Sequence, residues 1–548
     1  MAVTGWDRAA HKATATPLAQ DGPSRKQRRR VLAGLAVAAC AILVVGLRLG
    51  GHALLDPDES KHAEVAREML VTGNWIEPQI AFQPYHHKPS LLYWLIAGCY
   101  RAFGVNEWSA RLVPAAACCL TLLAVYWYAS ARVIGEGLLA VLLLGCSPMF
   151  LEVGRFTNFD ALVTLWTATA ALYLAWWLER GKEGPILPFY ALIGLGVLAK
   201  GPMAAAITLV PLAVPLGTGD LRLGELRLGR GAAVLAAVVS SWAAPVALGA
   251  PRYLIDFLWV HNVQRYLVPK AAFHPQPVYF FVPVLLAALL PWSVLLPWVI
   301  EWSWRERGAS RWLAAYACWV VIFFSLSSGK LATYVLPAFP AFAVLTARWL
   351  FAEAPARRGA RFPRALLLIA AGLLVLAPLA GGLALAREAA QLARYSLLLL
   401  PAAATGAWAL SSGRRWETRR FVTVLSGGLL ASLVLLHAAG GGVASYLSSD
   451  ADLAAVARRI GRPDRVVAFG VRPYSFLFYT RWPLVYQVGD DEYRRALRAP
   501  GRTLVLTKDK RLERLAQIAG PIEFEEIARN HRHLLAWARP RGTGEEGQ

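Results

Sequence analysis

Long runs of apolar residues, separated by short polar segments, dominate the chain between residues 31 and 446. A helix that crosses a membrane needs about 20 predominantly apolar residues, and thirteen segments approach or reach that length. They are 31–50, 111–131, 136–151, 161–178, 186–200, 203–217, 231–249, 278–300, 311–327, 331–351, 365–386, 394–411 and 420–440. The pattern therefore predicts an α-helical polytopic membrane protein with about thirteen transmembrane helices.

Two polar segments between these runs, 51–110 and 250–277, are long. Each contains apolar residues at helical spacing, which predicts a helix lying in the membrane interface. These residues are Ala63, Ala66, Met69 and Leu70 in the first segment, and Leu254, Phe257 and Leu258 in the second.

The composition changes near residue 447, where the apolar runs end. Short stretches with the pattern of β-strands alternate with stretches that have a helical pattern. The predicted strands are 465–470, 484–488 and 503–507, and the predicted helices include 490–499 and 508–519. This alternation predicts a small α/β domain over residues 447–548.

Charge defines the orientation of the chain. Lys and Arg number 57 against 35 acidic residues, a net charge of +22, yet charged residues make up only 17% of the chain. The usual share is about 25%, and a nucleic-acid-binding protein needs a solvated basic face, so no nucleic-acid partner is expected. Arginines gather before the first span and in alternate loops, which predicts a cytoplasmic N-terminus (1–30) and loops 51–110 and 250–277 on the outside. Thirteen spans then place the C-terminal domain on the outside as well.

The first span has an apolar stretch, Val31–Leu47, that is longer than the apolar region of a usual signal peptide. We therefore expect this span to be retained as part of the membrane domain.

Two acidic residues stand out at the predicted outer face. Asp58 follows the first span, and Asp160 opens the fourth. Two carboxylates that meet at one face can serve as a base and an orienting group around a substrate. The alternative for each is a helix cap, for which aspartate is well suited.

Lysine is rare in this arginine-rich chain, and half of its lysines fall at the predicted outer face near span ends. The lysine ammonium is a compact, movable charge that suits phosphate oxygens, although a lysine near a span end can also reach for the interface. The five are Lys61, Lys88, Lys200, Lys270 and Lys330. As a set they predict a site for a lipid phosphate beside the two aspartates.

Five segments carry a resemblance to a known family. Asp58–Met69 is similar to the family pattern D-E-x-R-Y-A-E-x-A-R-E-M, and Thr72–Pro78 to T-G-D-W-x-x-P. Pro84–Leu95 is similar to P-Y-x-E-K-P-P-L-L-Y-W-L, Leu198–Pro202 to L-T-K-G-P, and Lys330–Pro337 to K-L-P-x-Y-x-L-P. The chain thus resembles the GT-C polyprenyl-phosphate-sugar glycosyltransferases, a family that includes lipid A aminoarabinose transferases and protein O-mannosyltransferases.

The resemblance implies an inverting sugar transfer from an undecaprenyl-phosphate-linked donor to a periplasmic acceptor, lipid A in the first place. It also implies a bacterial inner-membrane protein in which loops 51–110 and 250–277 and the C-terminal domain lie in the periplasm. Asp58 matches the acid that activates the acceptor, and Asp160 matches a second acid. Glu59, Lys61 and Lys200 are further candidates for acceptor or phosphate contacts. The positions that match the family's donor-phosphate residues are Lys88, Arg265, Lys330 and Tyr334.

The resemblance also implies a divalent metal, with His87 and His274 as candidate ligands. His87 replaces the family's glutamate, and two imidazoles suit Zn²⁺, the alternative being that no metal is bound. Lys61 and His62 replace an arginine and a tyrosine next to Asp58, which leaves a protein or another glycan as an alternative acceptor.

A lipid or sugar transporter is the alternative from another functional class. Transporters place ionisable residues near the membrane midplane and repeat their broken helices. The charged residues here lie at span ends instead, which favours an enzyme.

Overall fold

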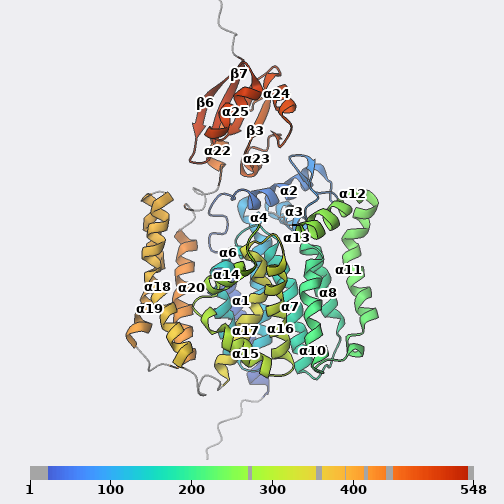
Figure 1. Ribbon diagram of the computed structural model, residues 1–548, viewed down its shortest axis with the longest axis vertical. Helices are drawn as coiled ribbons and strands as arrows, with labels where there is room; N and C mark the ends of the chain where they lie inside the picture. The colour runs from blue at the N-terminus through green and yellow to red at the C-terminus, as the bar shows by residue number, and fades with distance from the viewer. Residues whose placement is uncertain are drawn as a thin grey trace, which may run out of the picture.

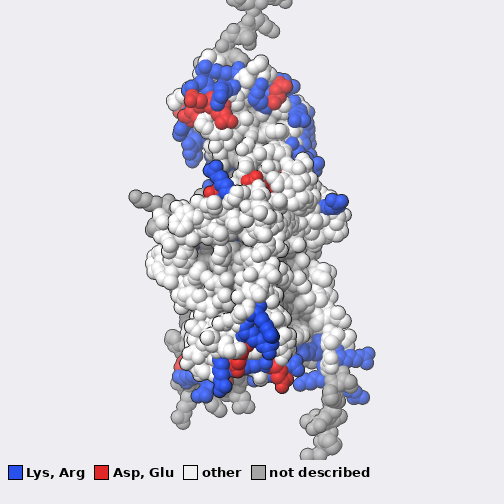
Figure 2. Space-filling view, turned by 90° about the vertical axis from the view of Figure 1, so that its right-hand side faces the viewer, with Lys and Arg blue, Asp and Glu red and all other residues white. Residues whose placement is uncertain are grey.

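The computed structural model describes residues 23–268, 274–352, 361–388, 390–412, 417–439, 443 and 449–540. In these residues the long helices run side by side and form a bundle (Figure 1). A small domain that contains a β-sheet stands on one end of the bundle, and α1 (Pro23–Gly46) begins at the other. Figure 2 shows Lys and Arg at both ends of the molecule, with a broad band without charged side chains between them. This is the layout of a multi-pass membrane protein.

Eight helical segments among the described residues are long and apolar enough to cross a membrane, or nine if the bent pair α5 and α6 is one span. The helices concerned are α1, α4 (Glu107–Ala129), α5 (Ile134–Gly145), α6 (Pro148–Gly154), α7 (Asp160–Glu179), η2 (Leu223–Leu226) with α11 (Leu228–Gly249), α16 (Ala309–Leu326), η7 (Ala332–Ala338) with α17 (Phe339–Phe351), α18 (Arg361–Glu388) and α20 (Thr418–Ala439).

Shorter helices fill the rest of the bundle. They are α3 (Leu91–Phe103), α8 (Leu187–Lys200), α9 (Met203–Leu209), η1 (Val210–Leu212), α10 (Ala213–Gly217), η5 (Val278–Phe280), α14 (Phe281–Ala288), η6 (Ser293–Leu295), α15 (Leu296–Arg305), η9 (Ala390–Leu399) and α19 (Leu400–Ser412). The second long polar segment is helical, as predicted, and consists of α12 (Pro251–Ile255), the π-helical η3 (Asp256–Gln264) and α13 (Arg265–Leu267).

Helix α2 (Asp58–Thr72) lies where the sequence predicts a helix in the first polar segment. It ends at Gly73, which has a φ of 69° and donates its N–H to the carbonyl of Met69, a common way for glycine to end a helix. Its polar side chains are not presented at the surface, as we expect of a helix in the interface, because every residue from Glu59 to Met69 except Lys61 is buried. The reason is that α2 packs against α3 on one side and against a helix of the C-terminal domain on the other.

The buried carboxylate of Glu59 holds three parts of the chain together. Two nitrogens of the Arg111 guanidinium, on α4, donate to it at 2.7 and 2.8 Å, and neither side chain is exposed. The backbone N–H groups of Leu55 and Thr157 also donate to it, at 2.9 and 3.1 Å. Glu59 therefore fixes the start of α2 to α4 and to the segment that precedes Asp160.

A second buried acid, Glu68, is held in its protonated form. Its Oε2 accepts the N–H of Phe82 at 2.8 Å, while its buried Oε1 has no donor among the described residues. Burial and the adjacent Glu64 raise the pKa of the Glu68 carboxyl to about 8. Glu64 itself accepts two hydrogen bonds from Arg67, at 2.7 and 2.6 Å. At neutral pH a proton on Glu68 Oε1 removes the repulsion between these two acids.

Glu68→Gln is expected to flatten the pH dependence of stability. The pKa of Glu68 is about 8 in the folded chain and 4.5 as its ordinary value, so its contribution to stability is complete below about pH 4.5 and is lost as the pH rises to about 8. Glutamine keeps the shape without ionising, and the variant should unfold at least about 2 °C above the wild type at pH 8.5. Thermal unfolding in detergent from pH 5 to 8.5 measures this. If the melting temperatures of wild type and variant changed with pH in parallel, the prediction would be contradicted. Glu301→Gln is the control, because Glu301 is an exposed acid.

The C-terminal domain contains a five-stranded sheet in the order β4-β3-β5-β7-β6. Strand β3 is parallel to β4 and β5, whereas β7 is antiparallel to β5 and β6. The elements are α22 (Ala451–Ile460), β3 (Arg465–Phe469), α23 (Tyr474–Thr480), β4 (Val485–Tyr486), α24 (Asp490–Arg498), β5 (Thr503–Thr507), α25 (Asp509–Ala519), β6 (Ile522–Arg529) and β7 (Leu534–Pro540).

Alternation along the strands explains the two layers of helices on this sheet. Val466 and Ala468 of β3 belong to the core under α22 and α23, whereas Val467 and Phe469 belong to the core under α24 and α25. Because successive side chains of a strand point to opposite faces, a strand this apolar is covered on both sides.

Helix α23 attaches the C-terminal domain to the bundle. Asp56, just before α2, accepts hydrogen bonds from the backbone N–H of Ser475 at 2.8 Å and from its hydroxyl group. Ser60 on α2 donates to the same carboxylate at 2.5 Å. Next to this contact, the hydroxyl of Tyr479 donates to Glu107 on α4 at 2.8 Å. The domain is thus held by specific buried bonds at the end of the bundle that carries α2.

Candidate active site

A cavity of about 1720 Å³ lies where the bundle, α2, η3 and the C-terminal domain meet. We call it the central cavity. It is lined by most of the polar residues that the sequence singled out, which come from six separate stretches of the chain. These residues are Asp58, Lys61, His87, Lys88, Asp160, Lys200, His274 and Tyr334. The structure thus brings this set of acids, lysines and histidines together at one cavity.

Asp58 presents an open carboxylate to the central cavity. It is the first residue of α2, and the residue in the cap position is Pro57, so the capping alternative does not describe its side chain. Its Oδ1 accepts a hydrogen bond from Lys61 at 2.5 Å, and 54% of the side chain is exposed. Although partial burial acts to raise it, Lys61, His62 and Arg472 together lower the pKa of the Asp58 carboxyl below its ordinary value. Asp58 is therefore an ionised carboxylate that a substrate can reach.

Asp160 is engaged by its neighbours instead. It is the first residue of α7, where Lys200, at the end of α8, forms an ion pair with its Oδ1. The hydroxyl of Thr333 donates to Oδ2 at 2.8 Å. The ammonium of Lys200 also lies 4.3 Å from the ring centroid of Tyr334, within the range of a cation–π contact. Asp160 thus positions a buried cation beside a tyrosine at the wall of the cavity.

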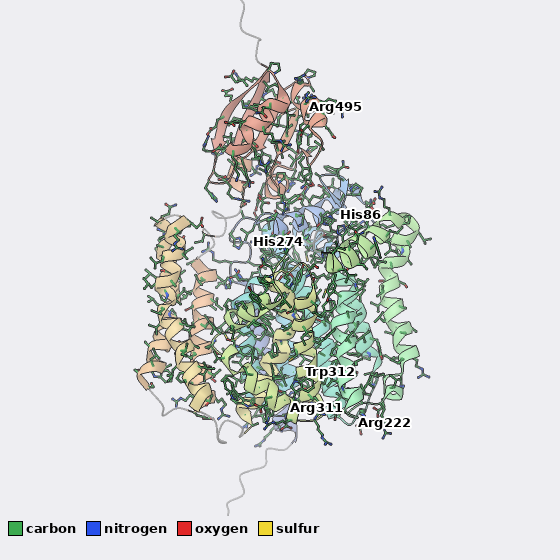
Figure 3. The ribbon with its side chains drawn as sticks, in the orientation of Figure 1. His86, Arg222, His274, Arg311, Trp312 and Arg495 are labelled. Carbon is green, nitrogen blue, oxygen red and sulfur yellow. The ribbon has the colours of Figure 1, made fainter. Side chains whose placement is uncertain are left out.

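His87 and His274 both line the central cavity (His274 is labelled in Figure 3). The ring of His87 lies between those of Tyr85 and His261, with centroid distances of 4.4 and 4.1 Å. Nowhere in the described ranges do three His, Cys, Asp or Glu side chains gather in a way that could hold a metal ion. Protein zinc sites use three or four such ligands, so a divalent metal held by His87 and His274 stays a prediction, and no step below involves one.

His86, next to His87, has a different role. Its Nε2 lies 2.7 Å from Glu77 and its Nδ1 2.9 Å from Asp256 on η3. Each ring nitrogen therefore has a carboxylate partner. This bridge ties the two long polar segments of the chain together below the C-terminal domain.

Two described residues of the predicted set, Glu59 and Lys330, do not line the cavity. Glu59 is fully buried in the contacts described above. The ammonium of Lys330 donates to the carbonyl oxygens of Gln276 and Ser327, at 2.9 and 2.6 Å, and burial lowers its pKa. The side chain of Arg265 and the whole of Lys270 lie outside the described residues.

The C-terminal domain supplies a wall that the sequence reasoning missed. Residues from the loop before α23, from α23 itself and from the β4 region line the cavity, among them Arg472, Tyr474 and Tyr486. No motif marks these positions, and they lie more than 100 residues beyond the last matched motif. The available signal was the aromatic content of residues 474–486, which is high for the surface of a small soluble domain.

Comparison with known proteins identifies relatives for parts of the chain. Residues 87–243 match the family model described as dolichyl-phosphate-mannose-protein mannosyltransferase. An undecaprenyl phosphate-alpha-4-amino-4-deoxy-L-arabinose arabinosyl transferase of Erwinia tasmaniensis is 35% identical over 310 residues, 54% of this chain and 55% of that protein. The protein of the same name from Pectobacterium carotovorum is 33% identical over 324 residues, 57% and 58% of the two chains. The matched part thus spans little more than half the length of these relatives.

A solved structure resembles almost the whole chain. The crystal structure of ArnT from Cupriavidus metallidurans bound to undecaprenyl phosphate superposes with a TM-score of 0.78 at 21% identity. The match covers 92% of this chain and 97% of the other. The two proteins therefore share one fold, including the arrangement of bundle and C-terminal domain.

Proposed function

We propose that the chain is a polyprenyl-phosphate-sugar glycosyltransferase, as its similarity to such proteins supports, and that it transfers a sugar from an undecaprenyl-phosphate-linked donor to lipid A at the periplasmic face of the membrane. One observation carries this proposal: the reachable carboxylate of Asp58 opens onto the same cavity as Lys88 and Lys200. A base and phosphate-binding cations in one cavity are what such a transfer requires.

The proposed reaction is a single inverting displacement. An oxygen of the acceptor attacks the anomeric carbon of the sugar, and its proton passes to the Asp58 carboxylate. The bond between that carbon and the phosphate oxygen breaks, and its electron pair leaves with the undecaprenyl phosphate. Cations held in place around this phosphate stabilise the charge that develops on it, so no acid is needed on that side.

Lys88, Lys200 and Tyr334 are the residues best placed to hold the donor phosphate. All three line the central cavity. Asp160 contributes by fixing Lys200 against Tyr334, so we assign it a positioning role. Arg265 and Lys330 stay predictions for this site, since the ammonium of Lys330 donates to backbone carbonyls in the structure.

We also propose thirteen spans, a cytoplasmic segment 1–30, a membrane domain 31–446 and a periplasmic domain 447–548. Each of the thirteen predicted segments contains a helix of the bundle, which supports the count. Arg222 and Arg311 lie at the end of the bundle opposite the C-terminal domain (Figure 3). Since positive residues mark the cytoplasmic side, their position supports a periplasmic C-terminal domain.

Reconstitution of the purified wild-type chain in vesicles tests the proposed activity. With undecaprenyl-phosphate aminoarabinose as donor and lipid A as acceptor, mass spectrometry should show lipid A heavier by one sugar residue, together with free undecaprenyl phosphate. Vesicles without the protein are the control. Movement of the donor across the bilayer with no covalent product would contradict the proposal and indicate a transporter.

The match to a protein-mannosyltransferase model makes a protein the second candidate acceptor. The same vesicles, given a periplasmic protein extract in place of lipid A, separate the two acceptors. Sugar on protein, with lipid A unchanged, would keep the chemistry and replace the acceptor.

A further inference from the structure

Arg472 is the cation that the C-terminal domain brings to the central cavity. It lines the cavity together with Asp58 and Lys61, and its side chain is exposed. Within the described part of the chain its guanidinium makes no ion pair or hydrogen bond, whereas Arg465, Arg498 and others of the same domain are bonded to carbonyl or carboxylate oxygens. An unpaired arginine is therefore available at this wall.

The backbone around Arg472 is held firmly. Its neighbours Val471 and Pro473 are both buried. Because their side chains occupy the interior of the domain, the side chain of Arg472 points out of it. Tyr474, next in the chain, packs into the core of the bundle, and Ser475 carries the two hydrogen bonds to Asp56. The bonds that attach the domain to the bundle thus also place Arg472 over the cavity.

The charge of Arg472 reaches the reactive carboxylate. It is among the groups that lower the pKa of Asp58, together with Lys61. Asp58 thus shares the cavity with a cation from α2, which is bonded to it, and a cation from the C-terminal domain. An acceptor with only neutral hydroxyl groups gains little from such a pair, whereas an acceptor with an anionic group beside its attacking oxygen is attracted by it.

We propose that Arg472 binds the acceptor by a phosphate group and thereby selects phosphorylated acceptors. The proposal rests on the proposed function and assigns the C-terminal domain a direct part in substrate recognition. The guanidinium matches phosphate oxygens with two parallel hydrogen bonds, while Lys61 holds Asp58 in place. Donor binding, by contrast, depends on residues of the bundle and should not involve Arg472.

Binding of lipid A to the full-length protein in detergent, without donor, tests this inference separately from catalysis. Arg472→Ala should weaken the binding of bisphosphorylated lipid A about 10-fold or more, and Arg472→Lys should recover part of the loss. Dephosphorylated lipid A should bind wild type and Arg472→Ala equally. Arg495→Ala is the matched control, since Arg495 is an exposed arginine of the same domain that does not line the cavity (Figure 3).

Undecaprenyl phosphate binding, followed by thermal shift, reports whether the variants remain folded and should be unchanged. If wild type and Arg472→Ala bind bisphosphorylated lipid A equally, the inference is overturned even where sugar transfer is observed. If the loss is the same for dephosphorylated lipid A, it is overturned as well, because the residue would then act on the shape of the site. Failure of the wild type to transfer sugar would overturn the proposed function but not a phosphate-dependent loss of binding.

Discussion

Asp58→Asn is expected to reduce the turnover of sugar transfer by a factor of about 100 or more. A positioned general base contributes roughly 10²–10⁴-fold to a rate, and asparagine keeps the size of the side chain while losing the ability to take a proton. Because Lys88, Lys200 and Tyr334 are untouched, the KM for the donor should stay close to that of the wild type. Initial rates with labelled donor at saturating lipid A measure both constants.

The pH profile gives a second readout for Asp58. Since its pKa is lowered by its cationic neighbours, the carboxylate is ionised throughout the neutral range, and activity should fall on the acidic side only below the ordinary pKa range of an aspartate. Asp491→Asn is the control, because Asp491 is exposed on α24 away from the cavity. Wild-type turnover in Asp58→Asn would rule out Asp58 as the base.

Arg111→Met is expected to destabilise the protein more than any other single substitution considered. It leaves the carboxylate of Glu59 buried, with neither side chain of the pair exposed in the wild type. Removing one partner of a buried ion pair costs about 3–5 kcal/mol. The melting temperature in detergent should fall accordingly, and the yield of folded protein with it. Arg101→Met, on an exposed arginine of α3, is the control and should have little effect.

A double variant separates the ion pair from simple loss of packing. Replacing both partners, as in Glu59→Leu with Arg111→Met, removes the uncompensated charge, and such exchanges are often neutral. We therefore expect the double variant to be more stable than Arg111→Met alone. A double variant as unstable as the single one would show that packing around Arg111 dominates.

The helices, and eight of the polar residues that line the cavity, were predictable because they follow local rules. Apolar runs of sufficient length mark the spans, and the motifs around Asp58, Lys88 and Lys200 lie at the ends of helices that converge at one face. The burial of α2 was not predictable in this way. Its pattern of Ala63, Ala66 and Met69 indicated one apolar face, whereas two partners enclose it and the polar side is satisfied by internal ion pairs such as Glu64 with Arg67.

The roles of individual charged residues depended on contacts that no spacing reveals. Glu59 and Asp58 are adjacent in sequence, yet one is buried against Arg111 and the other faces the cavity. Because neighbouring residues on a helix point about 100° apart, a single position decides between a structural and a chemical role. Arg472 lies far from every motif and reaches the site only through the attachment of α23.

The position of that attachment in the chain means that the cavity is completed late in the synthesis of the protein. The bonds between Asp56 and Ser475 join residues 419 positions apart, and the wall formed by residues 472–492 follows all the helices of the bundle in the chain. A ribosome therefore produces the whole membrane domain before the last wall of the cavity exists. A nascent chain that stops short of α23 has Asp58 and its lysines, but not the wall that completes the cavity around them.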